Sequence, residues 1–192
     1  MAATSTDIAN LALAKLRTPR ITALTDGSEM AIRVTDVYAL VRDIVLRSHP
    51  WNFAIKRSAL SKLASTPAFE FNNEFQLPSD CLRVLYMFDS DSEFRIEGRK
   101  LLTDDTTVDL VYVAQITAEG QFDPMFVEVF ALRLAVELAY ALDGKVTLVE
   151  HLMNQYTSAF RAAKAADGKE GTPKDIRYNF IEDARRTGKR RF

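Results

Sequence analysis

The feature that most constrains this chain is its longest apolar stretch, Phe122 to Leu142. Glu128, Arg133 and Glu137 interrupt it in its interior. Charges at those depths are too costly for a membrane-spanning helix, so we expect no membrane segment here. Asp123 followed by Pro124 favours a helix start, because aspartate caps the first turn and proline fits into it. The stretch predicts a helix over about 123–142 that is buried on most sides, in a core or a subunit interface.

Three further segments have helical periodicity, at about 5–17, 27–49 and 147–166. Asp26 can cap the second of these helices, and a capping box that begins at Thr147 can start the third. The second segment is amphipathic, and its apolar spacing predicts one buried stripe. That stripe consists of Met30, Val34, Val37, Tyr38, Val41, Ile44 and Val45.

The region from about 51 to 116 has a different pattern, in which short aromatic and β-branched runs are separated by turn residues. We expect a buried strand over 82–88 and an alternating strand over 107–116. Segments 94–97 and 99–102 predict a hairpin around a glycine. The sequence therefore predicts one small antiparallel sheet inserted between helices, which places the chain in the α+β class with a bundle of about four helices.

The C-terminal residues differ in charge from the rest of the chain. Residues 169–192 hold eight Lys or Arg and four Asp or Glu, whereas residues 1–168 hold 17 and 22. Too few apolar residues occur in 169–192 to build a core, so we expect one α+β domain over 1–168 and an extended basic arm over 169–192. The arm is interpreted either as a solvated terminus, as a segment that orders on a partner, or as a DNA contact. Its candidate contact residues are Arg177, Tyr178, Phe180, Ile181, Arg185, Arg186, Lys189, Arg190, Arg191 and Phe192.

Motifs for catalysis or for metal and cofactor binding are not found in the sequence. His49 is expected to cover carbonyls at a helix end, and His151 to lie in the first turn of a helix. The pair Asp104-Asp105 is interpreted as a polar turn between strands. Cys81 is the only cysteine, which excludes an intramolecular disulfide, and it is expected to be a small core residue. We therefore expect no catalytic, metal or cofactor site, and a protein that is not an enzyme.

Four strings together resemble the tail tubular protein A family of short-tailed bacteriophages. The most specific is Leu-Arg-Ser-His-Pro-Trp-Asn-Phe-Ala at 46–54, and the second is Phe-Gln-Leu-Pro-Ser-Asp-Cys-Leu-Arg-Val at 75–84. The others are Ile-Glu-Gly-Arg-Lys-Leu-Leu at 96–102 and Phe-Asp-Pro-Met-Phe at 122–126. The resemblance runs from about residue 8 to residue 165.

This resemblance implies a head-to-tail adaptor in the virion, made in the host cytoplasm. Identical subunits, twelve to match the portal, would form a ring between the phage portal protein and a tail nozzle of the tubular protein B kind. DNA would pass through the channel of the ring without sequence-specific binding. The C-terminal arm would reach up along the portal.

Several residues in these strings also have a direct physical interpretation as structural anchors. Pro50 ends the helix before it, and Trp51 and Phe53 can hold the exiting chain against the core, next to His49. Pro78 fixes a sharp turn before the following strand. Anchors of this kind maintain the shape of a domain, which agrees with an architectural role.

Two other classes of function stay open from the sequence. A DNA-binding or packaging accessory would use the basic arm as its nucleic-acid element, with strong dependence on salt. A small hydrolase would have to use Asp104, Asp105 or His151, for which the sequence offers little support.

Overall fold

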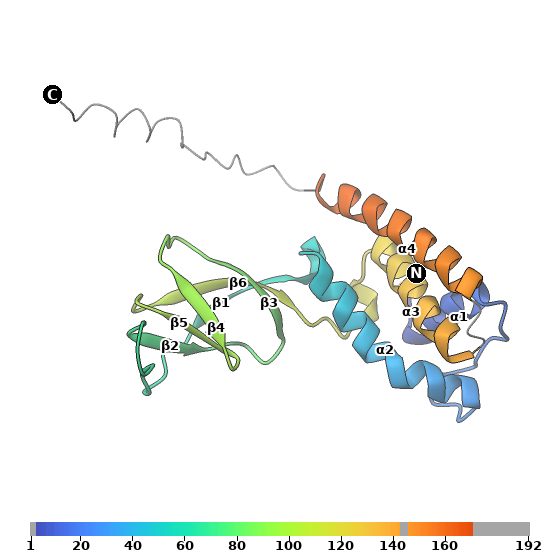
Figure 1. Cartoon of the computed structure of the whole chain (residues 1–192), viewed down its shortest axis with the longest axis horizontal. Helices are drawn as coiled ribbons and strands as arrows, with labels where there is room; N and C mark the ends of the chain where they lie inside the picture. The colour runs from blue at the N-terminus through green and yellow to red at the C-terminus, as the bar shows by residue number, and fades with distance from the viewer. Residues whose placement is uncertain (1–2, 143–145, 171–192) are drawn as a thin grey trace.

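The computed structural model describes residues 3–142 and 146–170, and it has the α+β architecture that the sequence predicts. Helices gather at one end of an elongated molecule and strands at the other (Figure 1). The predicted arm over 169–192 falls almost entirely outside the described residues.

The helix α3 (Pro124–Leu142) is the centre of the helical end, where it packs against each of the other three long helices. The Asp123 carboxylate accepts hydrogen bonds from the backbone N–H of Met125 at 2.8 Å and of Phe126 at 3.3 Å, which confirms the predicted cap. Most of its side chains are buried, as its apolarity predicts. No helix in the described ranges is long and apolar enough to cross a membrane.

Two helices precede the strands, α1 (Ser5–Lys15) and α2 (Glu29–Ser48). The predicted cap of α2 is wrong by two residues: Ser28 accepts from the N–H of Ala31 at 3.2 Å. Asp26 instead accepts from the N–H and hydroxyl of Ser28, at 2.9 and 2.6 Å, and so shapes the turn before the helix.

The buried stripe of α2 is narrower than predicted. Val34, Tyr38, Val41 and Val45 are buried as expected, whereas Ile44 is 42% exposed. Met30 and Val37 are half-buried at the edge of the core.

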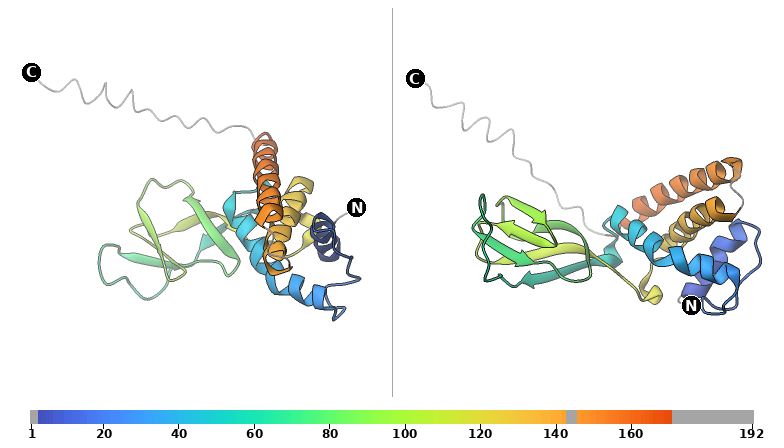
Figure 2. Two further views of the ribbon diagram at one scale, coloured as in Figure 1. Left: turned by 45° about the vertical axis from the view of Figure 1, so that its right-hand side comes forward. Right: turned by 60° about the horizontal axis from the view of Figure 1, so that its bottom comes forward.

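The last helix, α4 (Val146–Asp167), packs along α3. It already includes Val146, so Thr147 lies inside its first turn and is not the cap that the sequence predicts. Figure 2 shows α4 and α2 on different sides of α3.

The strands form two three-stranded antiparallel sheets, where the sequence predicts one. The first has the order β1-β6-β3, from β1 (Ile55–Leu60), β6 (Val108–Ala114) and β3 (Cys81–Met87). The second has the order β2-β5-β4, from β2 (Asn73–Gln76), β5 (Lys100–Thr103) and the predicted hairpin partner β4 (Phe94–Glu97). The chain passes back and forth between the two sheets, and buried residues of both belong to one apolar core with the helices.

The strand β3 is also less buried than the sequence predicts. Its two ends, Cys81 and Met87, are buried, while the residues between them are half-buried or exposed. Two register shifts against β6 change the direction of its side chains. A strict alternation of faces is therefore lost along this strand.

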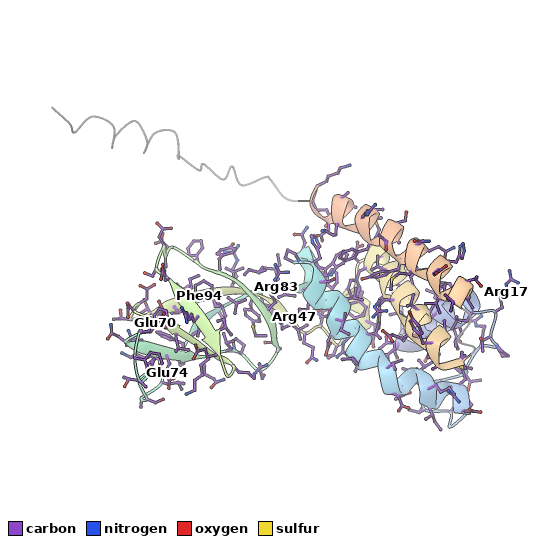
Figure 3. All side chains as sticks on the ribbon, in the orientation of Figure 1. Arg17, Arg47, Glu70, Glu74, Arg83 and Phe94 are labelled. Atoms are coloured by element: carbon purple, nitrogen blue, oxygen red, sulfur yellow. The ribbon has the colours of Figure 1, made fainter. Side chains whose placement is uncertain are left out.

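The helical end meets the first sheet at the C-terminal part of α2. Arg47 donates to the carbonyl of Leu82, and Arg83 donates to the carbonyl of Arg47 at 3.4 Å. Both arginines lie where α2 approaches β3 (Figure 3). Gln115, just after β6, donates to the Asp43 carboxylate at 2.6 Å. Reciprocal polar contacts thus fix the angle at which the strands leave the bundle.

Candidate site at the root of the C-terminal arm

The chain leaves α2 through a sharp change of direction at His49 and Pro50. His49 has extended dihedral angles, φ −144° and ψ 145°, and the following proline cannot continue the helical ladder. The chain then folds back, and the indole N–H of Trp51 donates to the carbonyl of Val45 at 3.0 Å. This carbonyl belongs to the last turn of α2, where backbone acceptors lack partners within the helix.

Trp51 is the centre of an aromatic cluster that joins three helices. It is 1% exposed, and its ring centroid lies 5.2 Å from that of Phe126 on α3 and 6.0 Å from that of Phe160 on α4. The His49 and Phe53 rings lie 4.9 and 6.3 Å from it. The predicted anchoring by Trp51 and Phe53 is therefore confirmed, and α2, α3 and α4 share this anchor.

Beside this cluster, the residues after α2 hold the last residue of α4. The Asp167 carboxylate accepts from the backbone N–H of Asn52 at 3.0 Å, and the Asn52 side-chain amide donates to the Asp167 carbonyl at 2.7 Å. The Nε2 atom of His49 lies 3.1 Å from the other carboxylate oxygen of Asp167. We call these three residues, His49, Asn52 and Asp167, the arm-root clamp.

The clamp compensates an arrangement that is otherwise unfavourable. An aspartate at the C-terminus of a helix faces the negative end of the helix dipole. Asn52 offsets this cost with two donors, one to the carboxylate and one to a terminal carbonyl of the helix. His49 was expected to cover carbonyls of its own helix; it pairs with Asp167 of α4 instead, so that expectation is wrong.

His49 is half-buried, and its burial lowers the pKa of the imidazole below the ordinary value of 6.5. The hydrogen bond and the charge of Asp167 oppose this shift without overcoming it. The imidazole is therefore neutral at neutral pH, and we assign its proton to Nε2, from which it is donated to Asp167.

The clamp fixes the point from which the chain continues toward the predicted arm. After Asp167, the N–H groups of Gly168 and Lys169 donate back to Lys164 and Ala166 at 3.1 and 2.9 Å, which ends α4. The arm residues predicted from the sequence lie outside the described residues: Arg177, Tyr178, Phe180, Ile181, Arg185, Arg186, Lys189, Arg190, Arg191 and Phe192.

The fifth predicted anchor, Pro78, lies between β2 and β3, in the segment that connects the two sheets. Arg99, in the turn of the β4–β5 hairpin, donates to the carbonyls of Pro78 and Ser79 at 2.8 and 3.1 Å. Asp80 accepts from Lys56 at 2.7 Å and from the Tyr112 hydroxyl at 3.1 Å. Burial first, and then the bond to Asp80, raise the pKa of Tyr112 to about 12.

The remaining candidates have structural roles in the described residues. Asp104 accepts from the backbone and side chain of Asn72, so the predicted turn after β5 is confirmed. Asp105 accepts from Ser90 and Ser92, and these bonds lower the pKa of its carboxyl.

Cys81 is buried, and burial raises the pKa of its thiol, in agreement with the role expected for it. His151 lies in the second turn of α4 and not in the first as expected, and its Nε2 atom is 3.0 Å from the Gln155 amide nitrogen. No cluster of three or more His, Cys, Asp or Glu that could hold a metal ion occurs within residues 3–142 and 146–170.

Neither a scan against models of known protein families nor a search of curated proteins finds a match for this chain.

Proposed function

We propose that this chain is a structural head-to-tail adaptor of the tail tubular protein A kind. Copies of it form a ring between a phage portal protein and a tail nozzle, and the ring continues the channel through which DNA passes. The protein acts by holding these parts together, without a reaction of its own.

One observation supports this proposal most strongly. Residues 49–53 of the most specific string supply Trp51 of the aromatic anchor and His49 and Asn52 of the arm-root clamp. The β region begins at Ile55, just after this segment, and the predicted arm over 169–192 follows α4, which ends at Asp167. This one segment therefore packs on the helical end, leads into the β region and holds the last residue of α4. A protein that connects two other assemblies needs its parts held in such a fixed arrangement.

The test uses the full chain and a chain that ends at Glu170, each mixed with the portal protein of the same phage. The shorter chain keeps the backbone bonds that end α4, so we expect it to stay folded. Light scattering at moderate salt should show the full chain joining the portal as a ring and the shorter chain failing to join. A folded shorter chain that joins the portal normally would remove the arm from the proposal.

A matched variant separates portal binding from DNA binding. It replaces Arg185, Arg186, Lys189, Arg190 and Arg191 with glutamine in the full chain. A protein that ignores the portal but binds DNA, and loses that binding in the variant and at raised salt, would be a packaging accessory instead.

A further inference from the structure

The helix α2 carries two neighbouring apolar stripes, of which the core uses one. The first contains Val34, Tyr38, Val41 and Val45, and it is buried against α3 and the strands. The second contains Val37, Leu40 and Ile44, again at steps of three and four residues. Leu40 is 63% exposed and Ile44 is 42% exposed. We call this second stripe the outer face of α2.

A helix with two apolar faces is suited to pack on its own core with one face and on a partner with the other. Asp36 lies one turn before Leu40, so it borders the outer face. Asp36 is exposed and makes no ion pair or side-chain hydrogen bond with any other described residue. The partner should therefore present a surface that accepts bulky aliphatic side chains and carries a positive charge.

The molecule itself presents such a surface on α4. Ser158, Ala162 and Ala165 are exposed small residues at steps of four and three along that helix. Arg161 is next to them, exposed, and also without a charged or hydrogen-bonding partner in the part of the chain that the structure describes. We call this the outer face of α4. The two faces are on helices that flank α3 on different sides (Figure 2).

We propose that the outer face of α2 in one copy of this chain packs on the outer face of α4 in the next copy, with Asp36 opposite Arg161. Large side chains of one helix would then fill the spaces between small ones of the other, as in ordinary helix packing. Because the two faces differ, the contact is heterologous and leaves a free face at each end, so it continues until a ring closes. This inference rests on the proposed adaptor function and names the lateral contact of its ring.

The test reverses each charge alone and then both. Asp36→Arg and Arg161→Asp each place like charges across every contact, and we expect self-association to become roughly tenfold weaker or worse. The double variant, D36R with R161D, restores opposite charges and should assemble again. An equal mixture of the two single variants should assemble as well, because alternating copies match at every contact.

Assembly is measured by sedimentation velocity, for the protein alone over a range of concentrations and for the protein bound to the portal. Two further variants test the apolar part of the contact. Leu40→Ser should weaken assembly, whereas Phe69→Ser, at an exposed apolar position between β1 and β2, should leave it unchanged. Circular dichroism checks that each variant is folded.

The outcomes separate this contact from the adaptor function. Rescue by the double variant without any portal binding would support the contact and overturn the adaptor proposal. Rings on the portal that tolerate both single reversals would overturn the contact and leave the adaptor proposal standing. A wild-type chain that does not assemble, with or without the portal, would overturn both. If Leu40→Ser acts only while residues 171–192 are present, the chain's own C-terminal residues occupy the outer face of α2, which also overturns the contact.

Discussion

Replacing Trp51 with alanine should destabilise the whole molecule, because this side chain joins three helices. It is 1% exposed and contacts aromatic rings from α3, α4 and its own segment. Removing a buried aromatic side chain of this size costs about 3–5 kcal/mol of unfolding free energy. The lost hydrogen bond adds little, because the Val45 carbonyl keeps a second donor, the Ser48 hydroxyl at 2.7 Å. We therefore expect a loss of about 4 kcal/mol from Trp51→Ala.

Urea and thermal unfolding, followed by far-ultraviolet circular dichroism, measure this loss. In a chain of this length, about 4 kcal/mol corresponds to a drop in Tm of roughly 8–16 °C. Trp51→Phe keeps most of the ring and should lose about 1–2 kcal/mol. Phe69→Ala is the matched control: Phe69 is 80% exposed, so its truncation should change stability by less than about 0.5 kcal/mol.

Trp51 is also the only tryptophan, so the fluorescence of the wild-type protein reports on this site alone. A buried indole should be poorly quenched by acrylamide until the protein unfolds. If Trp51→Ala loses less than about 2 kcal/mol, or if the folded protein is quenched as readily as free tryptophan, Trp51 does not join the helices as argued.

Two further measurements test the cap and the clamp. Ser28→Ala should lower the free energy of unfolding by about 1 kcal/mol, since it removes the acceptor for the Ala31 N–H. An unchanged urea midpoint would show that Ser28 is not the cap and would favour Asp26 in that role. Stability should fall as pH drops below 6.5, because the lowered pKa of His49 means that the unfolded chain binds the proton more readily than the folded one. This part of the pH dependence should vanish in His49→Asn, and an NMR titration that gives a pKa for His49 above 6.5 would contradict the assignment of a neutral imidazole.

The sequence predicts correctly those features whose signal lies within a few neighbouring residues. The start of α3 at Asp123-Pro124 and the hairpin that includes β4 and β5 follow from a cap, a turn residue and periodicity within a few positions. The cap of α2 shows the limit, because Asp26 and Ser28 are both good capping residues. Asp26 is held by the N–H and hydroxyl of Thr22, at 3.0 Å each, and that contact leaves the cap to Ser28.

Contacts between residues that are far apart in the sequence could not be predicted. The pairing of β1 with β6 connects Ile55 to Val113, and alternation within a strand does not identify its neighbour. This explains why one sheet was expected where there are two. Asn52 and Asp167 are 115 positions apart, and no sequence pattern marked them as a pair. One hint was present: an aspartate near the C-terminus of a helix opposes the helix dipole and so implies a compensating partner.

The segment after α2 has two structural roles, and neighbouring residues carry them out. Trp51 is buried among apolar rings, so its contribution is to the stability of the helical end. Asn52 is exposed and bonds to Asp167 through polar groups at the surface, where single hydrogen bonds contribute about 0.5–1.5 kcal/mol. Such contacts are too weak to decide whether the domain folds, but two donors and one imidazole on a single aspartate are enough to orient the end of α4. An adaptor of the proposed kind, which would fold before it meets its partners, would need these two roles to be separable.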